Sequence, residues 1–176
     1  KGIDSRVLAA EGQPRLMRIY DQLCLEYMGH DAAQLMLEGI HFQYKRRAST
    51  REFLDVAYKH RSLVIVNAND PVWLGELKEL GKGSDNDQTA FWLYSLLDAD
   101  LAIYLSSVDG LIHNIGKESE RKIDLVLGIT QRTQNMISKV NSQHGSYGMG
   151  SKLRKIDQMM DLNGQAVIAR GTLPGV

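Results

Sequence analysis

The chain has 176 residues, of which 43% are hydrophobic and 24% charged, a composition typical of soluble globular proteins. Lysine plus arginine equals aspartate plus glutamate, at 21 each, so no net field draws the protein to nucleic acid or to an anionic membrane. The single cysteine, Cys24, cannot form an internal disulfide, and no apolar run approaches the ~20 residues of a membrane span. We therefore expect one globular domain over residues 1–176, located in the cytoplasm, with neither nucleic acid nor membrane as a partner.

The first part of the chain predicts two helices and a strand. Gly12 and Pro14 interrupt a helical pattern between Val7 and Tyr27, so we expect a short helix and then a second helix from about Pro14. Apolar residues recur on the second helix at spacings of three and four, which predicts one buried stripe: Leu16, Ile19, Tyr20, Leu23 and Tyr27. A strand is expected over residues 32–37.

The next part predicts a basic surface, a helix and a strand that ends in a polar loop. A polar stretch of irregular pattern surrounds Lys45-Arg46-Arg47, and Thr50 is a candidate N-cap for a helix over 51–60. The run 63–66 is short, β-branched and uniformly apolar, as expected for a strand covered on both faces. It leads into the loop at 67–72, which is either a plain turn or a ligand-binding loop.

An acidic loop, a helix and a further strand follow. Three side chains in this loop can accept hydrogen bonds from the first N–H groups of a helix: Asp85, Asn86 and Asp87. They either cap the helix, which apolar spacing extends to Leu97, or hold a ligand. The run 101–105 predicts a buried parallel strand, with a turn from Ser106. Ligands bind at loops that leave the carboxyl ends of such strands, so both polar loops are candidate site walls.

The C-terminal part predicts a glycine-rich loop that opens onto a helix. Residues 145–152 approach a helix N-terminus, whose free N–H groups and positive dipole end suit phosphate, and Lys152 adds a full charge. The alternative is a mobile turn with Ser151 as the N-cap. A helix from Thr130 and a last strand over 166–169 are also expected. No metal site formed by side chains is expected, because no histidine has a partner at metal-ligand spacing.

Taken in chain order, seven segments resemble the glutamate 5-kinase branch of the amino acid kinase family, which includes the kinase half of pyrroline-5-carboxylate synthases. They are A-A-E-G-Q-P-R-L-M, A-A-Q-L-M-L, I-V-N-A-N-D-P-V, D-N-D, D-L-x-I-x-L-S-S-V-D-G-L, G-M-G-S-K-L and A-R-G-T-x-P-G-V. The resemblance implies an α/β fold, a three-layer sandwich with a mainly parallel central sheet. It also implies that the domain is incomplete at its N-terminus, without the family's first strands.

The resemblance implies a reaction as well: ATP-dependent phosphorylation of the side-chain carboxylate of L-glutamate, with Mg²⁺, as the first step of proline biosynthesis. A homo-oligomer is expected. The implied substrate-binding residues are Asn67, Asn69, Asp70, Asp85, Asn86 and Asp87. The implied nucleotide-binding residues are Ser106, Ser107, Asp109, Gly148, Met149, Gly150, Ser151 and Lys152. Among these, Lys152 is the implied catalytic cation that faces the ATP phosphates.

Several positions depart from the family pattern. The family has Asp where this chain has Ser107, Gly where it has Ser84 and Tyr147, and usually Glu where it has Ala68. The family's early K-x-G-S/T motif, whose lysine contacts the phosphates, has no counterpart in the sequence. The alternative to an active kinase is therefore a noncatalytic homologue that binds nucleotide or amino acid for regulation or assembly.

Overall fold

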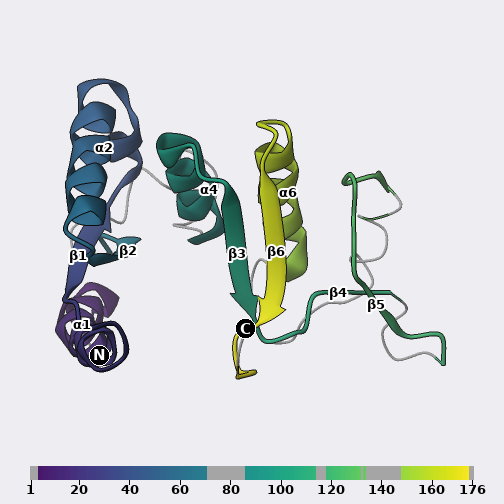
Figure 1. Ribbon diagram of the computed structural model, residues 1–176, viewed down its shortest axis with the longest axis horizontal. Helices are drawn as coiled ribbons and strands as arrows, with labels where there is room; N and C mark the ends of the chain where they lie inside the picture. Colours follow the sequence, from purple (N-terminus) through teal and green to yellow (C-terminus); the bar gives the residue numbers. More distant parts are fainter. Residues whose placement is uncertain (1–3, 71–85, 114–117, 132, 134–147, 175–176) are drawn as a thin grey trace. The chain divides into compact units, whose positions relative to one another are not determined.

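The computed structural model describes residues 4–70, 86–113, 118–131, 133 and 148–174, which are coloured along the chain in Figure 1. The chain divides into two compact units, Lys1–Thr89 and Ala90–Val176, and the boundary falls inside helix α4 (Asn86–Leu97). Each unit contains a pair of parallel strands with helices packed on it. The predicted α/β class is therefore confirmed.

The first unit contains two strands that leave their sheet at the same edge. Its elements in chain order are α1 (Ser5–Met28), β1 (Ala32–Leu37), the short 3-10 helix η1 (Gly39–Phe42), α2 (Tyr44–Lys59) and β2 (Leu63–Ala68). β1 and β2 pair in parallel from Ala32 opposite Leu63 to Leu37 opposite Ala68 (Figure 1). Because the two strands end opposite each other, the residues that follow them emerge side by side.

Helix α1 runs without a break through Pro14, so the predicted division at Gly12 and Pro14 is wrong. Proline inside a helix removes one backbone hydrogen bond and costs about 3 kcal/mol. Contacts to the sheet compensate for this cost; one of them is a hydrogen bond of 3.3 Å from the Ala32 N–H to Asp21 Oδ1. The helix ends at Gly29, whose φ of +68° is readily adopted by glycine and whose N–H donates to the Leu25 carbonyl.

The predicted buried stripe on α1 is also wrong, because the helix turns a different face to the sheet. The five apolar side chains of that stripe are 37–75% exposed: Leu16, Ile19, Tyr20, Leu23 and Tyr27. The less exposed positions recur at spacings of four and three along another face: Ala9, Gln13, Met17, Asp21 and Cys24. The inner face is therefore partly polar, and the more apolar face points outward in the first unit.

Helix α2 begins at Tyr44, so the basic triplet Lys45-Arg46-Arg47 lies in its first turn and not in an irregular stretch. Thr50 is an interior residue of the helix and not its N-cap. Its side chain is 7% exposed, and its hydroxyl donates to the carbonyl oxygens of Arg46 at 2.8 Å and His41 at 3.0 Å. The bond to Arg46 is the back-bonding that threonine can make within a helix, and the bond to His41 joins α2 to η1.

The second unit contains the parallel pair β3 (Leu101–Ser106) and β6 (Gln165–Arg170), with α6 (Gly148–Met160) packed on it (Figure 1). A short antiparallel hairpin, β4 (Leu111–His113) with β5 (Arg121–Ile123), follows β3. The sequence did not predict this hairpin, because β5 is charged and too short to show an alternating pattern. The core joins α4, β3 and α6, with Met159 fully buried and Tyr94 and Tyr104 each 7% exposed.

The two faces of β3 differ strongly in burial. Tyr104 points into the core, where its hydroxyl lies 3.8 Å from the Met159 sulfur. Leu101, Ile103 and Leu105 alternate with it and are 45–64% exposed. Parallel sheets are normally covered on both faces. The described part of the second unit therefore supplies the sheet and one of the two expected covering layers of helices. The orientation of Leu63–Val66 relative to Leu101–Leu105 stays a prediction.

Helix α6 begins at Gly148, so Gly148–Lys152 is its first turn and a half and not a loop. Ser151 is interior to the helix and 2% exposed, which excludes the alternative in which it is the N-cap.

The helix expected from Thr130 is described only in part: Thr130 Oγ1 accepts the Thr133 N–H at 3.3 Å, as an N-cap would. No helix in the described ranges, including the 24-residue α1, is both long enough and apolar enough to cross a membrane.

Candidate functional site

The polar loop after β2 lies at the carboxyl edge of the first unit's sheet. Asn67 is the next-to-last residue of β2 and pairs with Met36, while Asn69 and Asp70 follow the strand. The Asn69 N–H donates to the Leu37 carbonyl at 3.3 Å, which holds the start of the loop against the end of β1. The structure thus brings three of the predicted substrate residues together at one sheet edge, the usual location of ligands in this class of fold.

Helix α1 fixes the side chain of Asn67. Asn67 Oδ1 accepts the Ala68 N–H at 2.9 Å, and Asn67 Nδ2 donates to Gln13 Oε1 at 3.0 Å. The second of these bonds joins residues that are far apart in sequence, and Gln13 lies on the inner face of α1. Gln13 Nε2 is buried and has no hydrogen-bond partner among the residues that the structure describes.

The side chain of Asn69 is held by a residue that the motif does not contain. Asn69 Nδ2 donates to Glu38 Oε1 at 2.7 Å, and Glu38 is the first residue after β1. The Glu38 N–H in turn donates to His41 Nδ1 at 2.9 Å, within η1. Glu38 and Asn69 are both partly buried, so this charge-assisted hydrogen bond is shielded from water on at least one side.

The D-N-D segment lies at the start of α4. Asn86 is its first residue and is exposed, whereas Asp87, in the first turn, is 6% exposed. Asp85 lies outside the described residues. The convergence of Asp70 and Asp87 on one pocket stays a prediction, since the first turn of α4 follows a part of the chain that is not described.

The carboxyl edge of the second unit's sheet carries the predicted nucleotide-binding residues of β3. Ser106 pairs with Arg170 at the end of β6, and its carbonyl accepts the Gly171 N–H at 3.0 Å. The Ser107 side chain is exposed next to it. Asp109 forms a salt bridge of 3.1 Å with Lys122 of β5, and both side chains are about half exposed. Asp109 therefore anchors the hairpin, in addition to any contact with a ligand.

The first turn of α6 provides the other predicted nucleotide residues. Gly148, Met149 and Gly150 form this turn, in which backbone N–H groups have no partner within the helix. Lys152 is partly buried in the second turn, and its ammonium lies 5.8 Å from the centre of the Tyr104 ring on β3. This is a distance typical of cation–π contacts. The lysine is thus tied to the strand that ends at Ser106.

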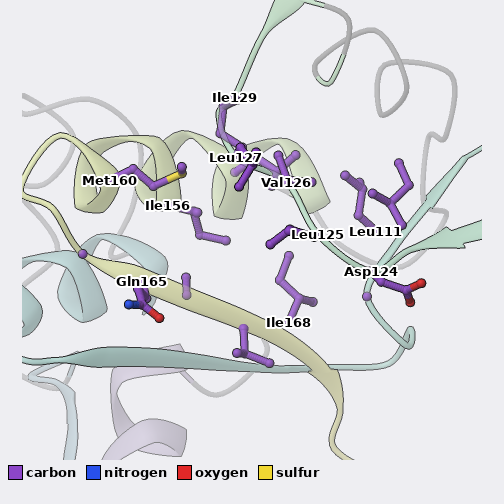
Figure 2. Close-up of a pocket in the computed structure, with 16 residues that line it drawn as sticks. Leu111, Asp124, Leu125, Val126, Leu127, Ile129, Ile156, Met160, Gln165 and Ile168 are labelled. Atoms are coloured by element: carbon purple, nitrogen blue, oxygen red, sulfur yellow. The ribbon is translucent and has the colours of Figure 1, made fainter.

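A mostly apolar cavity of about 420 Å³ lies beside β6 in the second unit. Figure 2 shows that α6, β6 and the segment 124–129 surround it, with Ile156 and Met160 on the helix and Ile168 on the strand. Asp124 and Gln165 are the polar side chains of its lining that are labelled in Figure 2. None of the predicted nucleotide-binding residues lines this cavity, so it is separate from the predicted phosphate site.

Within the ranges that the structure describes, no group of three or more acidic, histidine or cysteine side chains is arranged to hold a metal ion. At the N-cap of α1, hydrogen bonds from Arg6 lower the pKa of Asp4 to about 2. Ligand binding at the two candidate site walls would therefore depend on hydrogen bonds and on the charges of lysine and arginine side chains.

Three residues at these edges were missed by sequence reasoning. Glu38 directly follows a predicted strand, so the rule that ligands bind after strands could have found it. Arg170 ends β6 within the A-R-G-T segment, and its Nε donates to Thr172 Oγ1 at 3.1 Å. It adds a cation beside Ser106. No sequence signal points to Gln13. It holds the Asn67 side chain from the inner face of α1, and the apolar pattern of that helix did not predict this face.

Comparisons with known proteins show which family the sequence of this chain matches. The model of the amino acid kinase family matches residues 2–170. A glutamate 5-kinase of Ligilactobacillus salivarius is 29% identical over 175 residues, which cover 98% of this chain and 66% of that protein. A glutamate 5-kinase of Desulfotalea psychrophila is 33% identical over 176 residues, which cover 98% of this chain and 46% of that protein. The chain therefore spans roughly half to two thirds of the length of these relatives.

Proposed function

This chain belongs to the amino acid kinase family, and from that premise we propose that it forms part of a glutamate 5-kinase. The proposed reaction transfers the γ-phosphoryl group of ATP to the side-chain carboxylate of L-glutamate. The product is an acyl phosphate, and the reaction is the first step of proline biosynthesis. Curated relatives of that name, 29% and 33% identical to the chain, support the proposal.

The observation that carries the proposal is the arrangement of the polar loop after β2. Asn67, Asn69 and Asp70 emerge together at the carboxyl edge of a parallel pair, and separate partners hold the two asparagine side chains. A site that recognises an amino acid needs fixed acceptors and negative charge for its ammonium group and donors for its carboxylates. The loop offers an acceptor, Asn69 Oδ1, and the negative charge of Asp70 for the ammonium group on a rigid support. We propose that Asp85, Asn86 and Asp87 complete this pocket.

The second unit fits the phosphates of ATP. The first turn of α6 offers backbone N–H groups that have no partner within the helix, at the positive end of the helix dipole, and Lys152 adds a cation one turn later. Ser106, Ser107 and Asp109 are proposed to line the nucleotide site from the neighbouring edge. Mg²⁺, when bound, neutralises the charge on the transferred phosphates. It is commonly held by one or two carboxylates together with those phosphates, so a preformed cluster of protein ligands is not required.

The chemical problem is that an anionic carboxylate must approach an anionic phosphoryl group. Catalysis of such a step depends on positioning and on electrostatic stabilisation rather than on a covalent protein intermediate. In the proposal, the asparagine and aspartate side chains orient the amino acid, and Lys152 with the α6 N-terminus balances the charge that develops on the phosphoryl oxygens. Asn67, Asn69 and Lys152 each lie on, or directly after, a helix or strand.

The test is an assay of the full-length protein with ATP, Mg²⁺ and L-glutamate. Acyl phosphates react with hydroxylamine to give hydroxamates, which can be measured directly. We expect glutamate-dependent hydroxamate and an equal amount of ADP, with far less product from L-aspartate, whose carboxylate is one methylene nearer the ammonium. ADP release that does not depend on any amino acid would contradict the proposal.

One observation favours a second candidate function. Ser107 stands directly after β3, at a position where the glutamate 5-kinase pattern has Asp, and its side chain is exposed. A noncatalytic homologue that binds nucleotide or amino acid for regulation or assembly would tolerate this change. Such a protein would bind ATP or glutamate in calorimetry and give no hydroxamate. The variant Ser107→Asp separates the two cases further, because it would raise turnover only in a protein with a working site.

We also propose that the protein is a cytoplasmic homo-oligomer. The outward stripe on α1 supports self-association, because its five apolar side chains are well exposed in the first unit. Contiguous apolar surface of this kind usually marks a contact with another surface. A second copy of the chain is the occupant that we propose for the α1 stripe.

A further inference from the structure

The contact between Glu38 and Asn69 brings an additional carboxylate to the loop after β2. The two residues belong to different segments, and they meet because β1 and β2 end opposite each other at Leu37 and Ala68. The Asn69 backbone is fixed as well, through its N–H bond to the Leu37 carbonyl. Glu38 therefore lies at the edge where the proposed substrate pocket begins, although it belongs to none of the segments that suggested the function.

The chemistry of this contact determines which way the Asn69 amide faces. An asparagine side chain has an oxygen that only accepts and a nitrogen that only donates, and the two ends have almost the same shape. An ionised carboxylate accepts hydrogen bonds and donates none, so only Nδ2 can face Glu38 at 2.7 Å. Asn69 Oδ1 must then point away from Glu38, where it can accept a hydrogen bond from a ligand.

Asn67 provides a contrast within the same loop. Its Oδ1 accepts the Ala68 N–H and its Nδ2 donates to Gln13, so protein atoms engage both ends of its amide. Asn67 is thereby suited to hold the loop in shape. Asn69 has its nitrogen engaged by Glu38, which leaves the oxygen as the end that a substrate donor can use.

We propose that Glu38 is a positioning and specificity residue for the ammonium group of the amino acid substrate. It turns Asn69 Oδ1 toward that group and adds a negative charge beside Asp70, which favours a cation in the pocket. The inference rests on the proposed function, because it takes the loop after β2 as the amino acid pocket. It adds a residue and a role that the sequence motifs do not contain.

The test compares L-glutamate with glutarate, which has both carboxylates and lacks the ammonium. In Glu38→Gln the side chain keeps its size but can donate as well as accept, so Asn69 is no longer held in one orientation. We expect the KM for L-glutamate to rise about tenfold, as for the loss of one hydrogen bond to a charged group. We expect kcat, and kcat/KM for glutarate, to change less than about twofold, because neither depends on the ammonium contact.

A charge-matched control and a rescue complete the design. Glu52→Gln removes the same charge from an exposed position of α2 and should leave both substrates unaffected. The double variant Glu38→Gln/Asn69→Asp exchanges the amide and the carboxylate across the same hydrogen bond, and it should recover most of the lost affinity for L-glutamate.

Three outcomes would overturn the inference. An unchanged KM for L-glutamate in Glu38→Gln would show that the contact does not act on the substrate. An equal loss for glutarate would show a general disturbance of the pocket. A wild-type protein that neither uses nor binds L-glutamate would overturn the proposed function together with the inference, and that result is distinguishable because it appears before any variant is made.

Discussion

The N-cap of α1 carries a strong local ion pair. Asp4 accepts hydrogen bonds from the Arg6 backbone N–H at 2.9 Å and from its guanidinium at 2.6–3.2 Å, and these bonds lower the pKa of Asp4 from 3.8 to about 2. Because the folded pKa is depressed, the stabilisation is present above about pH 4 and is lost as the pH falls through about 2. A carboxyl-detected NMR titration should give this low value.

Arg6→Ala is the matched variant for that titration. It should return the pKa of Asp4 toward 3.8, and 1 M salt should shift the wild-type value in the same direction, because both groups are solvent-exposed. A pKa of Asp4 that stays near 3.8 in the wild type would contradict the ion pair.

Lys152 and Lys155 allow a controlled test of the proposed phosphate contact. Both lie on α6 with their ammonium groups 5.8 Å from an aromatic ring, Tyr104 for Lys152 and Phe91 for Lys155. Lys152→Met keeps much of the side-chain packing and removes the charge, so affinity for ATP with Mg²⁺ should fall roughly tenfold to a hundredfold in calorimetry. Lys155→Met should leave that affinity within about twofold. Equal effects of the two variants would count against a phosphate contact at Lys152.

At the residue scale, the sequence predicted polar side chains after strands but not their partners. Asn67, Asn69 and Asp70 could be assigned to a loop edge because they follow an apolar run. Their hydrogen bonds to Gln13 and Glu38 depend on how α1 and β1 pack, and such long-range pairings leave no periodic trace in a single sequence. Lys152 was expected at the N-terminus of a helix and lies one turn inside it, because glycines that suggested a loop are helical.

At the element scale, the turn between α6 and β6 has no room for a side chain. A Cβ at Gly164 would overlap the Tyr94 hydroxyl of α4 and lie 2.7 Å from the Met159 carbonyl oxygen. Gly164→Ala should therefore destabilise the protein by about 1–3 kcal/mol, as expected for overpacking. The loss should appear as a lower midpoint in denaturant unfolding followed by near-UV circular dichroism, which reports on the packing of aromatic side chains such as Tyr94.

Gly12 supplies the opposite case on α1. It lies inside the helix, and a Cβ there would meet nothing within 4 Å. Gly12→Ala should raise the free energy of unfolding by about 1 kcal/mol, since alanine is the better helix former. Destabilisation by Gly12→Ala would contradict the unbroken helix through Pro14, because a break at that point would require the freedom of glycine.

The elements themselves were predictable to different degrees. The four strands of the two parallel pairs were found within about two residues at each end, because a short run of uniformly apolar side chains has few other uses, whereas the hairpin β4–β5 was missed. Helix α1 was predicted with a false break and the wrong inner face. Proline is normally a reliable interruption, and the most apolar stripe is normally the buried one. Here polar contacts through Gln13 and Asp21 determine which face meets the sheet.

At the scale of the whole molecule, the α1 stripe predicts self-association. Leu23 is 45% exposed in the middle of the stripe. Leu23→Asp should place a charge in the proposed contact, so sedimentation velocity should show a smaller species than the wild type at equal concentration. Tyr58→Asp, at an 83% exposed position on α2, is the control and should sediment as the wild type does. A wild-type monomer would contradict the proposal.

Family membership could be recognised at this scale, while the arrangement of the whole could not be derived from periodicity. Seven ordered segments identified the amino acid kinase family, and the family model matches residues 2–170. Apolar runs predict that strands exist but not which of them pair. β1 pairs with β2, and β3 pairs with β6, through crossover connections of different length. A local sequence pattern does not show which strands such a connection joins.

The pairing of β3 with β6 has a consequence for synthesis on the ribosome. Leu101 pairs with Gln165, sixty-four residues later, whereas Ala32 pairs with Leu63 after only thirty-one. The first unit can close its sheet early in translation, but the backbone edge of β3 stays unpaired until β6 is made, and Tyr104 stays uncovered until α6 supplies Met159. Nascent chains stalled before Gln165 should therefore recruit chaperones that bind unpaired apolar strands, and stalled chains from which Arg170 has emerged should release them.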